Sequence, residues 1–357
     1  MRGRNRSISG ASRAATIADV ARLAGVSPMT VSRVVNGESS VSPATQDRVR
    51  SALSALRYVP NQAARHLAGG QPIRIGVLYG NPSASYLGEF LVGLLSQATD
   101  GRVQLMVQKC EAGADEEAVV RQLLAAGVDG LILPPPLCDS ASIVDLVSAA
   151  GIPAVAVASG QPDERLNALG IDDRLAAQEM TRHLLAMGHR RLGFIVGHPN
   201  QTASARRLQG FRDAMAAASL AVDEGLVVQG RFSYRSGLAA AAQIFAQEKR
   251  PTAVFASNDD MAAATVAIAQ LKGLEVPRDV SVVGFDDAPL AKTIWPALTT
   301  VRQPIQRMAE VAVELLVAQI RAGAAGKAQA PVRRLLDFSL IQRQSDAAPG
   351  QLVVTML

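Results

Sequence analysis

The sequence predicts an α/β protein in which a small all-α N-terminal domain with a helix-turn-helix precedes two doubly wound α/β lobes. The first observation is length, because 357 residues exceed what one domain usually holds. The second is that the positive charge is concentrated in the first fifth of the chain. The third is that, from residue 73 onward, short apolar runs alternate with longer amphipathic stretches, as parallel sheets with covering helices require.

The charge is divided unequally along the chain. Residues 1–71 hold ten arginines and three acidic residues, whereas the remaining chain holds 26 basic and 28 acidic residues. A basic segment joined to a near-neutral body is typical of proteins that bind nucleic acid or a membrane surface. The alternative is a basic tail that is merely solvated.

The cysteine content and hydropathy exclude several classes. Cys110 and Cys138 are the only cysteines, too few for a disulfide framework or a zinc ligand set, and they fit a reducing cytoplasm. No metal or cofactor is expected. No run of about 18 apolar residues predicts a transmembrane helix. Residues 1–14 are rich in Arg, Ser and Gly without an apolar stretch, so we expect a disordered basic tail and not a secretory signal.

Residues 15–60 carry the signals of a helix-turn-helix. Thr16 and Asp19 have a capping-box-like spacing at a helix start. Gly25 supplies a turn, and Ser27 with Pro28 suits the start of a second helix. A helical hairpin with a solvated outer face is the alternative, but the tight turn and the basic charge favour DNA binding. The second helix leaves four residues facing outward: Met29, Thr30, Ser32 and Arg33.

Residues 61–71 read as a linker, and residues 72–343 read as the α/β core. The first lobe is expected at about 73–171 plus 303–330, and the second at about 172–302 plus 331–343, with a C-terminal tail at 344–357. Strands are predicted at 73–79, 103–108, 130–133, 154–157, 192–196, 226–229, 252–256 and 280–285. Helices are predicted at 86–98, 114–126, 140–150, 174–187, 204–218, 235–247 and 259–272.

The segment TIADVARLAGVSPMTVSRVVNG, followed by VSPATQDRVRSALSALRYVPNQAARHLAGG, resembles the headpiece and hinge of the LacI-type (lactose and galactose repressor) family of bacterial transcriptional regulators. The later segments GVDGLILPPP, GHRRLGFIVG, PTAVFASNDDMAAA and PRDVSVVGFDDAPLA match as well, so the resemblance covers nearly the whole chain. It implies a core similar to a periplasmic sugar-binding protein. It also implies a repressor whose operator affinity a small carbohydrate or sugar derivative controls allosterically, located in the cytoplasm on the bacterial nucleoid.

The resemblance assigns DNA-side roles. Pro28, Met29 and Arg33 match the positions that face base edges, where Arg33 suits a bidentate contact to guanine. Leu67 matches a residue that wedges into the central base step from a hinge helix. The alternative for Ser27 is that it only caps the helix. The alternative for Leu67 is that it is a plain linker residue. Phosphate contacts are expected from Thr16, Ser27, Thr30, Ser32, Asn36 and Ser42, and hinge contacts from Asn61, Ala64 and Leu67.

Paired headpieces imply a homodimer on a pseudo-palindromic operator, and the resemblance implies a central CpG. The C-terminal residues 343–357 lack a leucine heptad, so we expect the assembly to stop at a dimer.

The effector is expected to lie between the lobes, at the carboxyl ends of the strands. Arg207, Asn258 and Asp286 match the family's polar ligand contacts, a donor and acceptor set suited to vicinal hydroxyls. As alternatives, Arg207 could be a surface residue of a helix, Asp286 could cap the next turn, and Phe232 could be a core residue. Trp295 lies either at the rim of the cleft or in a packing contact. The predicted effector contacts are Tyr86, Asp172, Arg207, Phe232, Asn258, Asp286 and Gln303.

One departure concerns the ligand. Ala158 stands where the lactose repressor has an acidic sugar contact, which weakens any expectation of the same sugar. The residues suit a neutral sugar, and Arg207 also suits an acid or a phosphate. They fit either an inducer or a co-repressor, and the resemblance favours an inducer.

Two functions of other classes are alternatives. A sugar-binding transport protein is opposed by the attached headpiece. A dinucleotide enzyme is opposed because GVLYGN after the first strand is not G-x-G-x-x-G, and no nucleophile triad, metal cluster or phosphate loop is apparent. We therefore expect a protein that is not an enzyme.

Overall fold

The computed structural model describes residues 16–35, 41–56, 72–99, 102–110, 115–325, 327 and 330–350. The chain divides into two compact units, Met1–Pro72 and Ile73–Leu357. The expected basic tail at 1–14 and the expected hinge at 61–71 lie outside the described residues.

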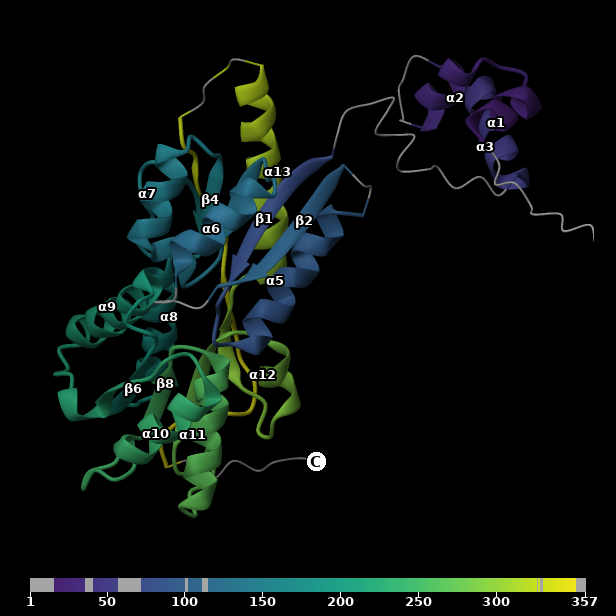
Figure 1. Cartoon of the computed structure of the whole chain (residues 1–357). Helices are drawn as coiled ribbons and strands as arrows, with labels where there is room; N and C mark the ends of the chain where they lie inside the picture. The colour runs from purple at the N-terminus through teal and green to yellow at the C-terminus, as the bar shows by residue number, and fades with distance from the viewer. Residues whose placement is uncertain are drawn as a thin grey trace, which may run out of the picture. The chain divides into compact units, whose positions relative to one another are not determined.

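The N-terminal unit contains the predicted helix-turn-helix and a third helix (Figure 1). The Thr16 hydroxyl accepts a hydrogen bond from Asp19 N, and the Asp19 carboxylate accepts one from Thr16 N at 3.0 Å, so the capping box is present. The first helix ends at Gly25 in the left-handed region, with φ 64°. A small apolar core joins the helices α1 (Ile17–Ala24), α2 (Pro28–Val35) and α3 (Pro43–Ala55).

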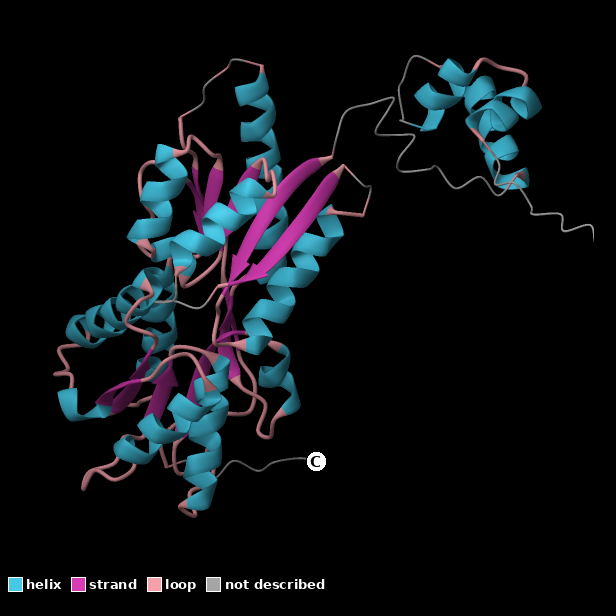
Figure 2. Cartoon of the chain, viewed as in Figure 1, coloured by secondary structure: helices cyan, strands magenta, loops and turns pink. Residues whose placement is uncertain are grey.

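The first lobe of the second unit is built on an entirely parallel sheet in the order β11-β5-β4-β3-β1-β2. Helices cover both faces of this sheet (Figure 2). The strands are β1 (Ile73–Tyr79), β2 (Val103–Lys109), β3 (Gly130–Leu133), β4 (Ala154–Val157), β5 (Asn167–Gly170) and β11 (Arg333–Leu335). The helices are α5 (Ala84–Gln97), α6 (Glu116–Ala125), the 3-10 turn η1 (Leu137–Asp139), α7 (Ala141–Ala149) and α13 (Ile305–Ala324).

The second lobe repeats this design with the order β12-β10-β9-β8-β6-β7, in which only β12 is antiparallel to its neighbour. Its strands are β6 (Leu192–Val196), β7 (Val227–Gln229), β8 (Ala253–Ala256), β9 (Ser281–Asp286), β10 (Thr299–Arg302) and β12 (Ser339–Ile341). Its helices are α8 (Asp173–Ala186), α9 (Thr202–Ala217), η2 (Glu224–Leu226), α10 (Tyr234–Ile244), α11 (Asp259–Leu271) and α12 (Pro289–Thr293).

One apolar cluster runs through both lobes. It contains Ile75 and Val157 from the first sheet together with Phe194 and Phe285 from the second. The Phe194 ring lies 4.8 Å from the Phe211 ring, centroid to centroid. The two sheets are therefore held together by a shared core, with the carboxyl ends of their strands turned toward the boundary between the lobes.

The structure corrects two expected boundaries. Strand β11 at 333–335 pairs with β5 in the first sheet, so residues 331–335 do not belong to the second lobe. The expected tail from residue 344 is also wrong at its start, because Ser345 is fully buried. The Ser345 hydroxyl donates to Val282 O and accepts from Thr299 N at 2.8 Å, which fastens this segment to the second lobe.

The chain consequently crosses between the lobes three times, after β5, after β10 and after β11. Within the described residues, the helices are too short or too polar to cross a membrane. The same residues contain no cluster of three or more His, Cys, Asp or Glu side chains that could hold a metal ion.

Candidate functional site

A pocket lies where the carboxyl ends of the strands of both sheets meet. In each sheet the chain reverses its direction of winding beside the first strand, at β1 and at β6, and ligands of such folds bind at this point. The first lobe contributes Asn81, Ser83, Tyr86, Pro135 and Ala158 to the lining. The second lobe and the crossover after β10 contribute Gln201, Ala203, Arg207, Phe232, Asn258, Asp286 and Gln303.

The structure brings six of the seven predicted effector contacts to this pocket: Tyr86, Arg207, Phe232, Asn258, Asp286 and Gln303. Asp172 is the exception. Its carboxylate accepts a hydrogen bond from Leu175 N at 2.9 Å and caps α8, away from the pocket lining. The following residue, Asp173, contacts Arg207 instead. Trp295 is 59% exposed, so the packing alternative is wrong, and it is not among the residues that line the pocket.

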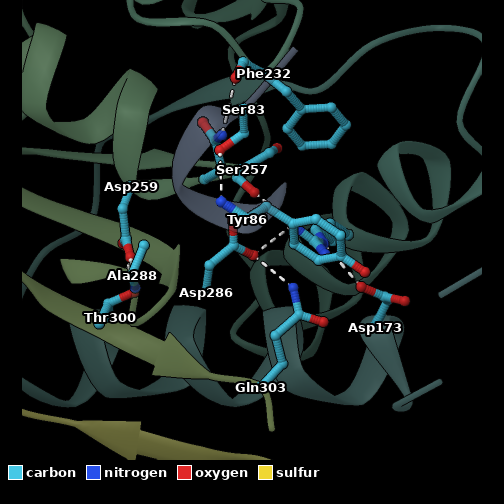
Figure 3. A network of polar contacts seen from close by, with 12 residues as sticks. Ser83, Tyr86, Asp173, Phe232, Ser257, Asp259, Asp286, Ala288, Thr300 and Gln303 are labelled. Carbon is cyan, nitrogen blue, oxygen red and sulfur yellow. Dashed lines mark hydrogen bonds and ion pairs between the residues drawn. The ribbon is translucent and has the colours of Figure 1, made fainter. Parts of the chain in front are cut away.

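Arg207 is the charged centre of the site, and Figure 3 shows its partners Asp173, Ser257 and Asp286. Its Nε donates to Asp173 Oδ1 at 2.8 Å, and its Nη1 donates to the carbonyl of Ser257 at 2.6 Å. The guanidinium carbon lies 3.6 Å from the centroid of the Phe285 ring. The side chain is buried, so the alternative of a surface helix residue is wrong. Such a network fixes the guanidinium while leaving N–H groups for a ligand.

Asp286 stands at the end of β9 with a φ of 113°, a conformation that non-glycine residues rarely adopt. One carboxylate oxygen accepts from Gln303 Nε2 at 2.5 Å and lies 3.8 Å from Arg207 Nη1. Burial raises the pKa of Asp286 to about 7, against the lowering influence of Arg207. The strained backbone thus holds a proton-accepting side chain in the pocket.

Asn258 and Phe232 form one wall. The Asn258 amide donates to the carbonyl of Phe232 at 3.0 Å, while its oxygen accepts from Met261 N and caps α11. Phe232 has a φ of 58°, and its ring lies so close to Gly197 that a Cβ there would come within 2.1 Å of it. The glycine therefore makes room for an aromatic face at the pocket.

Three buried polar atoms of the lining have no hydrogen-bond partner in the described part of the chain: Tyr86 Oη, Gln201 Nε2 and Gln303 Oε1. Burial is also the main cause of the raised pKa of Tyr86. Gln201 was not predicted, because it precedes α9 in a polar loop and its spacing marks no function. Buried polar groups of this kind are normally satisfied, so an unfilled set points to a ligand.

Hydrogen bonds tie the lobes together beside the pocket. The Ser83 hydroxyl of the first lobe donates to Asp260 Oδ2 at 2.5 Å. The Asp139 carboxylate of the first lobe accepts from the backbone N and the hydroxyl of Thr202, both at 2.8 Å. These hydrogen bonds therefore join the two lobes next to the pocket lining.

The predicted DNA-contact residues have different local roles. Ser27 accepts from Thr30 N at 3.2 Å, and Thr16 caps α1, so both have a structural function. Ser42 precedes α3 and donates to the Thr45 hydroxyl at 2.9 Å. Pro28, Met29 and Arg33 are exposed on α2, with Met29 at 66%. The side chain of Ser32, together with Asn36, Asn61, Ala64 and Leu67, lies outside the described residues.

Comparisons with known proteins agree with both units. Residues 16–61 match the family model "Bacterial regulatory proteins, lacI family", and residues 181–345 match a periplasmic binding protein-like domain. The HTH-type transcriptional regulator CelR of Thermobifida fusca is 34% identical over 92% of this chain and 98% of that protein. The catabolite control protein A of Priestia megaterium is 32% identical over 84% of this chain and 91% of that protein.

The solved structures give the same result. The CelR–cellobiose complex has a TM-score of 0.71 at 32% identity, covering 93% of this chain and 99% of that chain. The lac repressor dimer bound to operator and the anti-inducer ONPF has a TM-score of 0.71 at 30% identity, covering 94% and 100%. Together with the fold and the site, these relatives define the chain as a DNA-binding transcriptional regulator with a ligand-binding core. The chain belongs to the LacI family of bacterial regulatory proteins.

Proposed function

We propose that the chain represses transcription as a homodimer on a pseudo-palindromic operator with a central CpG, and that a small carbohydrate between the lobes acts as its inducer. The observation that carries the ligand part is the convergence of Arg207, Asn258 and Asp286 with an aromatic face in one pocket. That the related CelR is known in complex with cellobiose supports a sugar ligand. The protein would act in the cytoplasm, on the nucleoid.

The effector contacts proposed are the six predicted residues that line the pocket, with Asp172 left out. The DNA contacts proposed are the residues assigned from the resemblance: Thr16, Ser27, Pro28, Met29, Thr30, Ser32, Arg33, Asn36, Ser42, Asn61, Ala64 and Leu67. Binding of a ligand that prefers one arrangement of the lobes shifts the population of the whole dimer, and the operator must change ligand affinity by the same factor.

The experiment is a thermal-shift screen of the full-length protein against a sugar library, followed by gel shifts on the upstream regions of neighbouring genes. A sugar that raises the melting temperature and releases DNA supports the proposal. A sugar that stabilises the protein but strengthens DNA binding makes it a co-repressor. Release of DNA only by compounds that are not carbohydrates contradicts the sugar assignment.

The base-reading role of Arg33 has a separate test. Arg33→Ala should weaken operator binding by about 5- to 150-fold and relax specificity at one base pair per half-site, since a bidentate guanine contact contributes about 1–3 kcal/mol. Arg22→Ala is the control, because Arg22 lies exposed on α1 beside Asp19 and carries the same charge. A uniform loss of affinity for every operator sequence in Arg33→Ala would instead indicate a phosphate contact.

A further inference from the structure

The chemical class of the ligand can be narrowed from the charges of the pocket. The three unpartnered atoms, Tyr86 Oη, Gln201 Nε2 and Gln303 Oε1, belong to side chains that are 5%, 5% and 4% exposed. None of the three groups carries a charge at neutral pH. Gln303 Oε1 can only accept and Gln201 Nε2 can only donate, so a ligand that completes the set must offer a donor as well as an acceptor, as hydroxyl groups do.

The one cation in the lining is already balanced. Arg207 donates to Asp173 at 2.8 Å and lies 3.8 Å from Asp286, and the side chains of both acids are at least nine-tenths buried. One guanidinium therefore faces two carboxyl groups before any ligand arrives. When Asp286 is protonated the group is neutral, and when it is ionised the group is negative.

An anionic ligand gains little from such an arrangement. A carboxylate or phosphate would lose its hydration on entering the pocket and would meet no net positive charge in return. A hydroxyl group, in contrast, can donate to Asp286 or Gln303 and accept from Tyr86, Gln201 or Arg207. The Phe232 ring offers an apolar surface to the C–H face of a ring.

We propose that the pocket selects an uncharged polyhydroxylated ring over its acidic or phosphorylated counterparts, and that Asp173 sets this preference by neutralising Arg207. The inference rests on the proposed function and deepens it. Asp173 is a positioning residue that acts through Arg207, while Tyr86, Gln201 and Gln303 contact the ligand.

The test compares matched ligands by isothermal titration of the full-length protein: D-glucose with glucose 6-phosphate and glucuronate, D-galactose with galacturonate, and cellobiose with cellobionate. At least one neutral member should bind, and its anionic counterparts should bind at least tenfold more weakly. Equal or tighter binding of an anionic member overturns this inference and leaves the proposed function standing. Binding of no sugar in this set or in the screening library overturns both.

Variants test the role of Asp173. In Asp173→Asn, Arg207 keeps only Asp286 as a counter-charge, so the group becomes neutral or positive and the anionic counterpart should gain at least tenfold relative to the neutral sugar. Asp172→Asn makes the same charge change one residue earlier, outside the pocket, and should leave the preference unchanged. An unchanged preference in folded Asp173→Asn refutes its role. If Asp173→Asn fails to fold, as its melting curve would show, the comparison of ligands on the unmodified protein still decides the selectivity.

Gln201→Ala tests the uncharged contacts. It should weaken the neutral sugar about tenfold without altering the preference for neutral over anionic ligands. Unchanged affinity in Gln201→Ala would remove this residue from the contact set.

Discussion

Replacing Asp286 by Asn should change the pH dependence of stability in a calculable way. The folded-state pKa of Asp286 is about 7, whereas an unfolded Asp has a pKa of about 3.9. The folded protein therefore binds more protons at this site, and the stabilising contribution is fully present below the unfolded pKa. It is lost as the pH rises through about 7.

The magnitude follows from the two pKa values. Between about pH 5.5 and about pH 8, this one group removes roughly 2 kcal/mol from the free energy of unfolding. Asn cannot ionise, so Asp286→Asn should gain about 2 kcal/mol relative to the unmodified protein over the same interval. The charged groups that face Asp286 are present in both proteins: Arg207, Asp173, Asp259 and Asp260.

The adjacent Asp287 provides the control. Its carboxylate accepts from Arg302 Nε at 2.7 Å and from Arg343 Nη2 at 2.5 Å, whereas the nearest Arg207 nitrogen lies 3.8 Å from Asp286. Asp287→Asn should cost about 1.5–3 kcal/mol at both pH values, because charge-assisted hydrogen bonds are weakened. Both residues have a positive φ, which Asn tolerates, so neither substitution should strain the backbone.

The assay is urea unfolding of the full-length protein at fixed concentration, followed by the fluorescence of Trp295, the single tryptophan, which lies in the second lobe. Stability is compared between variant and unmodified protein at each pH. The reasoning is refuted if the difference in free energy of unfolding between Asp286→Asn and the unmodified protein does not change with pH. It is also refuted if the variant becomes less stable relative to the unmodified protein as the pH rises.

Two further substitutions test packing and capping. Gly210→Ala places a Cβ 2.0 Å from Arg174 O between α9 and α8, so it should lower stability by about 1–3 kcal/mol, as overpacking does. Gly88→Ala, which meets nothing within 4 Å on α5, is its control and should be neutral or stabilising in thermal melts. Thr16→Ala removes the cap of α1 and should cost the headpiece about 0.5–2 kcal/mol. Weaker operator binding in gel shifts would then follow at constant sugar affinity, and a changed sugar affinity would contradict the local role of this cap.

The sequence predicted most of the long elements because apolar runs and helical spacing decide them, but α13, the 20-residue helix at 305–324, was missed. Strand β1 at 73–79 and strand β3 at 130–133 have the predicted bounds. Strands β5, β10, β11 and β12 were missed, since none of them is a continuous apolar run as β3 is. These short strands fix the sheet edges and one of the crossovers, so the assignment of residues 331–335 to a lobe required the structure.

The residues of the site were likewise predicted only in part. Six of the side chains that the resemblance marked line the pocket, but it marked Asp172 where Asp173 faces Arg207. Two adjacent acids at a helix start look alike in sequence, and only the helix geometry decides which one points inward. Gln201 and Ser345 carry no sequence signal at all, because their roles come from neighbours distant along the chain.

The hydrogen bonds from Ser83 to Asp260 and from Thr202 to Asp139 bear on how fast this regulator can respond. Tyr86, behind them, is only 5% exposed, so a ligand reaches it after the lobes have parted. Association is then governed by the frequency of opening and not by diffusion alone. Bound ligand is released through the same opening. A regulator with slow lobe opening averages over brief fluctuations in ligand concentration and responds to sustained changes.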